Sequence, residues 1–128
     1  MTAPASHRSE SQEMHILGAL PHPVIVCDKD GFFHYANTDA EQFFSASRTY
    51  LLRRRLQDFI PLDNPVFSLI EKVLAEQSRF SEYRVDLSSP RLGAERLVDL
   101  YVANVPETPH LAVVIIQLRS IAEKMDRQ

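Results

Sequence analysis

The sequence is poor in the residue types that most often carry chemistry. Among its 128 residues are one cysteine, three glycines and no tryptophan. The lone Cys27 excludes an internal disulfide and a cysteine-based zinc cluster. The five histidines are scattered without the spacing of metal ligands. We find no nucleophile–base pair, metal cluster or phosphate-binding loop, so the sequence predicts neither a catalytic residue, a metal site nor a cofactor within this chain.

Long apolar runs and an excess of positive charge are also missing. The run AVVII at 112–116 has the length of a strand, whereas a membrane span needs about 18 apolar residues. Residues 1–13 lack the apolar region of a secretory signal and are polar enough to be disordered. The net charge is −3, whereas a nucleic-acid-binding domain usually has an excess of basic residues. We therefore expect a cytoplasmic protein without a membrane or nucleic-acid partner.

The first half of the chain shows a helix, a hairpin and short helices. Residues 14–20 carry a short apolar strip, and two β-prone runs at 24–27 and 32–36 flank the turn DKDG. Gly31 suits that turn because glycine adopts positive φ without penalty. Thr38 and Glu41 have the spacing of a helix capping box, ahead of Phe43 and Phe44. Short helical turns are expected from there to Pro61.

The second half predicts one longer helix, three strands and a last helix. Asn64 can cap the helix and Pro65 can occupy its first turn, with an apolar face of Phe67, Ile70 and Leu74 beside Val66 and Val73. Strands are expected at 81–87, 95–105 and 111–118. Ser120 and Glu123 form a second capping box, and no Gly or Pro ends the segment. The pattern predicts an α+β fold, with residues 14–118 as one domain and 119–128 as the start of a helical linker to a further domain.

Six segments in order resemble a known family. The segments are LPHPVIV, YANTDAEQFF, LLRRRLQDFIP, EYRVDL, PRLGAERLVDLYVANVPE and RSIAEKMDRQ. Together they resemble the sensory PAS domain of the nitrogen-regulation sensor histidine kinases (NtrB), from about residue 14 to the end of the chain. Asn104 and Leu118 depart from the family pattern. The resemblance implies a five-stranded antiparallel sheet with helices on one face, an N-terminal flanking helix and a C-terminal exit helix. It also implies that Asn37 ties the second strand to the following helix.

The same resemblance implies a role. NtrB proteins bind ATP, autophosphorylate on a histidine and pass the phosphoryl group to the response regulator NtrC, and the signalling protein PII opposes this. The phosphoacceptor histidine would lie beyond Gln128, so the chain itself is expected to be a regulatory module and not an enzyme. The competing hypothesis is a small-molecule or cofactor-binding PAS sensor from another signalling protein.

Several residues admit both a structural and a functional interpretation. Cys27 lies in an apolar strand and is expected to be a buried small hydrophobe. His22 is flanked by prolines that forbid a phosphoacceptor helix, and His34 is expected to pack against or bond to a neighbour rather than bind a ligand. Residues 53–55 are three arginines with two possible roles. They form a solvated face that Asp58 and Asp63 partly neutralise, or they form a docking patch that binds an acidic partner or the kinase core. Five side chains form either a core or a ligand cavity, with a core favoured: Phe43, Phe44, Phe59, Phe67 and Ile70.

Two terminal segments favour signalling on physical grounds. Ile16, Leu17 and Leu20 form a strip too short to be a stable helix alone, so we expect it to dock on a second copy of the domain. Ile121 and Met125, four residues apart, can begin a coiled-coil seam that leads toward a kinase core in cis. The expected mechanism is a dimeric module whose exit helix biases the kinase.

Overall fold

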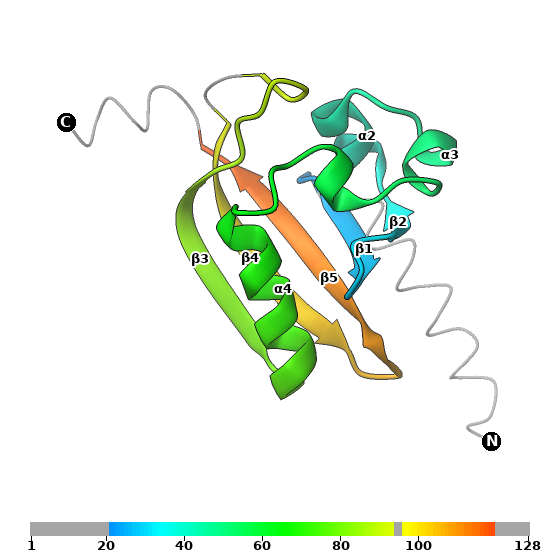
Figure 1. Ribbon diagram of the computed structural model, residues 1–128, viewed down its shortest axis with the longest axis vertical. Coiled ribbons are helices and arrows are strands. Elements are labelled where there is room, and N and C mark those ends of the chain that lie inside the picture. The colour runs from blue at the N-terminus through cyan, green and yellow to red at the C-terminus, as the bar shows by residue number, and fades with distance from the viewer. Residues whose placement is uncertain (1–20, 94–95, 120–128) are drawn as a thin grey trace.

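The computed structural model describes residues 21–93 and 96–119, and Figure 1 shows their arrangement. Each half of the chain contributes strands to one sheet, and the helices lie between them in sequence. In chain order the elements are β1 (Val24–Asp28), β2 (Phe33–Ala36), α2 (Thr38–Phe44), α3 (Arg48–Leu51), the 3-10 turn η1 (Leu56–Asp58), α4 (Pro65–Glu76), β3 (Arg79–Asp86), β4 (Leu97–Val105) and β5 (Thr108–Leu118).

The five strands form one antiparallel sheet in the order β2-β1-β5-β4-β3. The first and last strands of the described chain therefore lie side by side in the middle, where Val26 pairs with both Tyr35 and Val113. The predicted five-stranded antiparallel sheet is confirmed. β3 begins at Arg79 and β5 at Thr108, both earlier than predicted. β5 begins early because the β4–β5 connection is a two-residue turn that pairs Val105 with Thr108.

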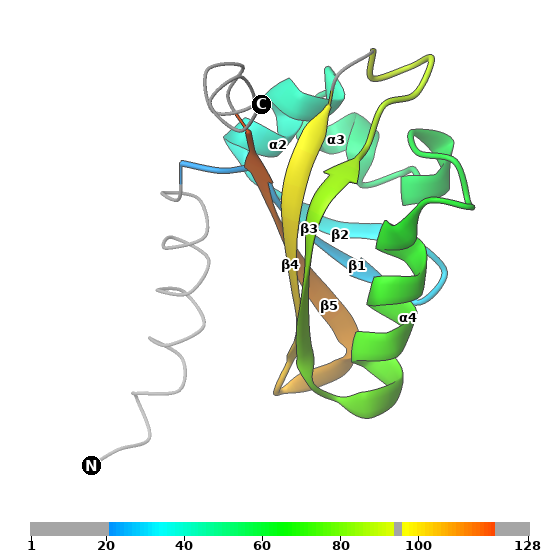
Figure 2. The same ribbon diagram turned by 90° about the vertical axis from the view of Figure 1, so that its left-hand side faces the viewer.

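Helix α4 lies along one face of the sheet, as Figure 2 shows. Asn64 caps it by accepting a hydrogen bond from the Val66 N–H, and Pro65 occupies its first position, as predicted. Its buried stripe is Val66, Leu69, Ile70 and Val73, which follows the i, i+3, i+4, i+7 spacing of one helix face. The predicted face was wrong in part, because Phe67 and Leu74 lie only partly buried at the edge of that stripe.

The predicted capping box at Thr38 and Glu41 is wrong. Asn37 is the N-cap of α2, and its side-chain oxygen accepts from the Ala40 N–H at 2.9 Å. Thr38 is exposed inside the first turn, and the Glu41 carboxylate instead accepts a hydrogen bond from the Arg48 N–H. Asn37 takes the cap because its buried side chain is already fixed between strand and helix. The short α3 and η1 confirm the helical turns expected before Pro61.

One hydrophobic core joins the helices to the inner face of the sheet. Strand residues that alternate along β1, β4 and β5 point into it, among them Ile25, Leu100 and Val114, each fully buried. A second, smaller cluster lies on the opposite face, where Val24, Val26 and Tyr35 are buried. The sheet is therefore apolar on both faces along its centre.

Candidate functional site

Asn37 is the junction of the first hairpin and the first described helix. Its Oδ1 accepts from the Val24 N–H at 2.9 Å and from the Ala40 N–H at 2.9 Å. Its Nδ2 donates to the His22 carbonyl at 2.9 Å. The side chain is 1% exposed, so these bonds replace the water it would otherwise contact. The tie between strand and helix that the family resemblance implied is present, and it also holds the segment before β1.

The five residues proposed for a ligand cavity lie in one hydrophobic core, and the rings of three of them, Phe43, Phe44 and Phe59, pack on one another. Phe44 lies at the centre, with edge-to-face contacts at centroid distances of 5.1 Å to Phe43, 5.5 Å to Phe33 and 5.2 Å to Phe59. Such geometry is the one favoured by the ring quadrupoles in a filled core. Ile70 is buried in the same cluster and Phe67 packs on its edge. The core interpretation is the one that this packing supports.

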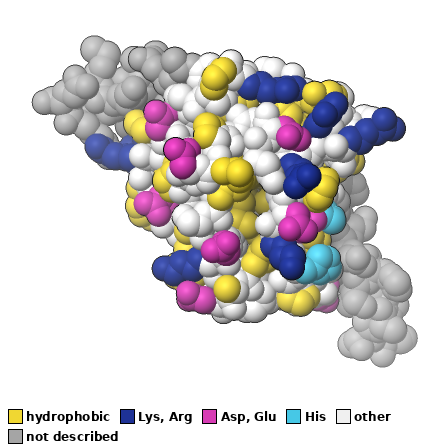
Figure 3. Space-filling view, in the orientation of Figure 1, with side chains coloured by type: hydrophobic (Ala, Val, Ile, Leu, Met, Phe, Trp, Pro, Cys, Tyr) yellow, Lys and Arg dark blue, Asp and Glu magenta, His cyan; other side chains and the backbone are white. Residues whose placement is uncertain are grey.

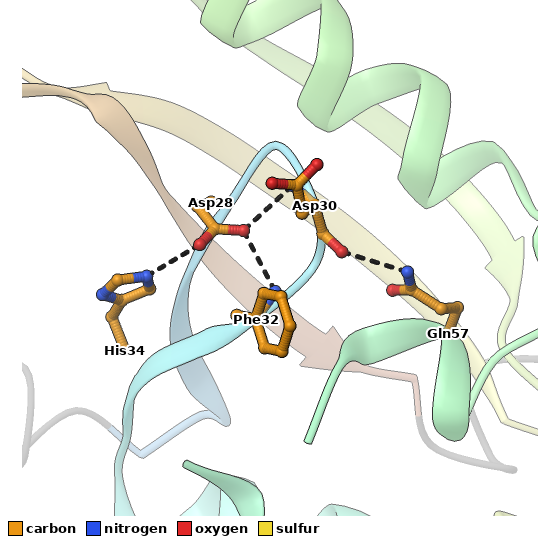
Figure 4. A network of polar contacts seen from close by, with 5 residues as sticks. All are labelled: Asp28, Asp30, Phe32, His34 and Gln57. Carbon is orange, nitrogen blue, oxygen red and sulfur yellow. Dashed lines mark hydrogen bonds and ion pairs between the residues drawn. The ribbon is translucent and has the colours of Figure 1, made fainter. Parts of the chain in front are cut away.

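The β1–β2 turn holds a network of polar contacts around Asp28 (Figure 4). The Asp28 Oδ1 accepts from the backbone N–H of Asp30 at 2.9 Å and of Phe32 at 3.1 Å. Its Oδ2 lies 2.9 Å from His34 Nε2, which confirms that His34 bonds a neighbour. Partial burial raises the pKa of Asp28, but the hydrogen bonds from His34 and the two backbone groups outweigh it and leave that pKa lowered.

Gln57 of η1 braces the same turn, a contact that the sequence analysis missed. Its Nε2 donates to the Asp30 carbonyl at 3.0 Å, as Figure 4 shows. Its Oε1 is buried without a hydrogen-bond partner and lies against Gly31, so that a Cβ at this position would clash with it. A cavity of about 270 Å³ opens beside the turn and reaches Phe67 and Glu71 of α4. A 26-residue separation between Gly31 and Gln57 leaves no local sequence signal for this contact.

Cys27 is fully buried in the core. Burial, with the nearby Asp28 charge adding to it, raises the pKa of the thiol to about 12. Because the thiolate is the reactive form, this cysteine is chemically inert in the folded protein. The prediction of a buried small hydrophobe is confirmed.

The outer face of the sheet carries a partly exposed apolar strip next to the buried residues of β1. Leu111, Val113 and Ile115 of β5 pack against Val24 and Val26. In the next strand Tyr101 pairs with Ile115 and Ala103 with Val113, and both are half-buried. We call Tyr101, Ala103, Leu111, Val113 and Ile115 the outer strip. Its partial exposure on a sheet face gives it the character of a contact surface.

The chain leaves the sheet at a charged pair that the sequence analysis did not find. Arg119 Nε and Nη2 donate to the two carboxylate oxygens of Asp99 at 2.9 and 3.0 Å. The Arg84 N–H donates to the same carboxylate at 3.0 Å, and Asp99 is 8% exposed. A carboxylate inside the otherwise apolar run LVDLYV was the signal that could have marked Asp99. The pair fixes the backbone at the end of β5.

The arginine run is exposed, and no ion pair joins it to an acidic side chain of residues 21–93 and 96–119. Asp58 lies beside the run, where its carboxylate accepts from the Arg55 backbone N–H, and the partial neutralisation by Asp58 and Asp63 stays a prediction. The guanidinium of Arg54 instead lies 4.5 Å from the centre of the Tyr50 ring, and that of Arg55 lies 4.9 Å from the Phe32 ring. Basic side chains gather over α3 and the segment after it in Figure 3.

The remaining predicted residues lie outside the part of the chain that the structure describes. They are the proposed dimer contacts Ile16, Leu17 and Leu20 and the proposed exit-helix residues Ser120, Ile121, Glu123 and Met125. Within the described residues, no group of three or more His, Cys, Asp or Glu could hold a metal ion. None of the helices described there is long and apolar enough to cross a membrane.

Comparison with known proteins identifies the family to which this fold belongs. Residues 17–119 match the family model described as PAS fold. The chain is 48% identical over 127 residues to the sensory histidine kinase/phosphatase NtrB of Rhizobium meliloti, and 42% identical over 127 residues to NtrB of Rhizobium leguminosarum. Each match covers 99% of this chain and 33% of the relative, so the chain spans about a third of the length of these curated relatives.

Among solved structures, the PAS domain of nitrogen regulation protein NR(II) from Vibrio parahaemolyticus has the same fold. It superposes with a TM-score of 0.68 at 19% identity, covering 82% of this chain and 95% of that one. A PAS domain from a two-component sensor histidine kinase superposes with a TM-score of 0.63 at 17% identity, covering 89% and 99% of the two chains. The chain therefore belongs to the PAS family, and within that family it is similar over nearly its whole length to part of the NtrB sensory histidine kinases.

Proposed function

We propose that this chain is the dimeric sensory input domain of a cytoplasmic NtrB-like histidine kinase that controls nitrogen assimilation. The longer protein would bind ATP, autophosphorylate on a histidine beyond Gln128 and phosphorylate an NtrC-like response regulator, with PII opposing that activity. The domain itself would carry no catalytic step. The observation that carries this proposal is the 48% and 42% identity to NtrB proteins across 99% of the chain.

The role proposed for the domain is mechanical. β1 and β5 are neighbours in the centre of the sheet, so the entry and exit of the domain are connected through one ladder of hydrogen bonds. The Asp99–Arg119 pair holds the last described turn of chain against β4. A change in the sheet would therefore reach Arg119, the last described residue. This coupling is what a two-state relay between a sensor and a kinase requires.

Dimerisation would use the outer strip together with residues 14–20. A second copy that buries Val113, Ile115 and Tyr101 would remove their exposed apolar surface from water. Changing both Leu17 and Leu20 to Asp should then shift the domain toward a monomer in light scattering. An unchanged dimer mass in that double variant would contradict the role given to residues 14–20.

The proposal includes no bound cofactor. The residues that a ligand cavity would need are occupied by contacts among Phe33, Phe43, Phe44 and Phe59. This packing supports a relay domain over a ligand sensor, because a ligand would first have to separate rings that are already in contact.

The proposal is tested with the full-length protein, purified together with an NtrC-like response regulator. Radiolabelled ATP should phosphorylate the kinase and then the regulator, and absence of both reactions would contradict the proposed function. The relay is tested separately with Asp99→Asn, which removes the negative charge that pairs with Arg119 and one of its two acceptor oxygens. This variant should change the ratio of kinase to phosphatase activity at least about threefold, since losing one partner of a buried pair destabilises it strongly. The exposed Asp63→Asn is the matched control and should leave the ratio unchanged. Equal ratios in all three proteins would contradict the relay but not the kinase assignment.

A further inference from the structure

Tyr50 lies between two arginines from distant parts of the chain. The Arg54 guanidinium lies 4.5 Å from the centre of its ring and the Arg91 guanidinium 5.5 Å from it. Arg91 also lies 4.6 Å from the centre of the Phe59 ring, and its Nη2 donates to the Tyr50 hydroxyl at 2.9 Å. We call Tyr50, Arg54 and Arg91 the arginine clamp. Stacking on aromatic rings orders the two guanidiniums and lowers the entropy lost when they bind a partner.

The clamp presents hydrogen-bond donors without acceptors. A guanidinium can only donate, and the Tyr50 oxygen already accepts from Arg91, which leaves its O–H to donate outward. The two arginines form no ion pair with an acid of residues 21–93 and 96–119. The negative charge of Asp58 acts on Tyr50, and Oδ2 of the Asp58 carboxylate accepts a hydrogen bond from the Arg55 backbone N–H. The hydrogen bond from Arg91, with the positive charges of both arginines, lowers the pKa of Tyr50 despite its slight desolvation, which strengthens the hydroxyl as a donor.

The surroundings of the clamp indicate a protein partner. Leu52 is 41% exposed between Tyr50 and Arg54 in sequence, and Phe32 beside Arg55 is 40% exposed. Arginine, tyrosine and phenylalanine side chains are enriched at protein interfaces, and here exposed arginines and Phe32 lie near the half-buried Tyr50. The whole chain carries a net charge of −3, which opposes the approach of a long polyanion such as nucleic acid. A short acidic segment can use the local positive charge without meeting that repulsion.

We infer that the arginine clamp is a docking site for a carboxylate-rich segment of a partner protein. Carboxylates only accept hydrogen bonds, and their two oxygens match the planar fork of a guanidinium. One carboxylate would accept from Arg54, a second from Arg91, and the Tyr50 O–H would donate to one of them. The inference does not depend on the proposed kinase role, because it rests on contacts within this domain.

The test uses the 128-residue chain and a fluorescein-labelled peptide of eight glutamates, with binding followed by fluorescence anisotropy at low salt. Changing both Arg54 and Arg91 to Gln should weaken binding by about tenfold, since each exposed ion pair contributes up to about a fivefold change in affinity. The matched control changes both Arg79 and Arg84 to Gln. These exposed residues lie on β3, at the opposite edge of the sheet from β2, and the same loss of charge there should change the affinity by less than about twofold.

Two further measurements separate the clamp from simple charge attraction. Tyr50→Phe keeps the ring and both positive charges but removes the hydroxyl, and it should weaken binding by about threefold. A labelled 12-base-pair DNA duplex should bind more weakly than the peptide. The inference is overturned if the wild-type chain does not bind the peptide, if the β3 control loses as much affinity as the clamp variant, or if the duplex binds as tightly. Circular dichroism of each variant establishes that it is folded. If the clamp variant is unfolded, the single change Arg54→Gln replaces it and should lower the affinity for the peptide by about threefold.

Discussion

The side-chain oxygen of Asn37 lies 2.9 Å from the backbone nitrogen of Val24, and it accepts the hydrogen bond of that N–H. Val24 begins the central strand β1, while Asn37 begins the helix that follows β2. The Asn37 amide therefore closes the hairpin at its open end and caps α2 at the same time. This relationship explains why Asn37 starts the helix: its Oδ1 accepts from the Val24 and Ala40 N–H groups, while its Nδ2 donates to the His22 carbonyl.

Replacing Asn37 by Ala should lower the free energy of unfolding by about 2–3 kcal/mol, because it leaves the buried Val24 N–H without its acceptor and removes the helix cap. Thr38→Ala is the matched control and should change stability by less than about 0.5 kcal/mol. Urea unfolding followed by circular dichroism measures both. If both variants lose the same free energy of unfolding, the assignment of Asn37 and not Thr38 as the helix cap would be contradicted.

Gly31→Ala should be costlier than Gly93→Ala, although both glycines have a positive φ, at 90° and 94°. At Gly93 an added Cβ meets nothing, so only backbone strain of about 1 kcal/mol is expected. At Gly31 it also displaces the Gln57 side chain and its bond to Asp30, raising the loss to about 2 kcal/mol. The double variant in which Gly31 and Gln57 are both changed to Ala, compared with Gln57→Ala alone, should show only the strain. A loss at Gly31 no larger than that at Gly93 would argue against the Gln57 brace.

The hydrogen bonds to Asp28 predict a pH dependence of stability. Because its pKa is lowered in the folded state from the ordinary value of 3.8, the ionised carboxylate stabilises the fold at neutral pH. That contribution is lost as the pH falls below 3.8 and through the folded-state pKa. Asp28→Asn should therefore flatten the decline of unfolding free energy between pH 5 and about pH 2.5, whereas Asp63→Asn should keep the slope of the wild type. Identical curves for wild type and Asp28→Asn would contradict the proposed bonding.

Cys27 should react with a thiol reagent only when the protein unfolds. Burial raises its pKa to about 12, so almost no thiolate is present at neutral pH. The rate of reaction with Ellman's reagent should match the rate of global or local opening and rise sharply in urea. Rapid labelling of the folded chain at pH 7 would show that the β1 strand is more accessible than its position in the core allows.

Much of this fold was predictable because its signals are local. The Asp-Gly turn, the Asn64–Pro65 helix start and the strand runs each depend on a few adjacent residues, and all three are present. The helix cap was predicted wrongly because two local motifs competed for it. Thr38 and Glu41 have the capping-box spacing, but the cap position belongs to Asn37, whose contact with Val24 spans 13 residues.

The candidate sites were less predictable, because their contacts are long-range. The Asp99–Arg119 pair spans 20 residues and the Tyr50–Arg91 contact spans 41. No periodicity links such positions in one sequence. The arginine run was visible in the sequence, but the second arginine on the Tyr50 ring, Arg91, comes from the loop before β4.

Native mass spectrometry of the purified 128-residue chain tests the central claim most directly, since the account describes a ligand-free domain that works as a dimer. The predicted result is a species of two chains without an adduct, which becomes a single chain when Leu17 and Leu20 are both changed to Asp. A wild-type species of one chain would contradict the dimer. A reproducible non-covalent adduct of defined mass would contradict the ligand-free domain and favour the small-molecule sensor.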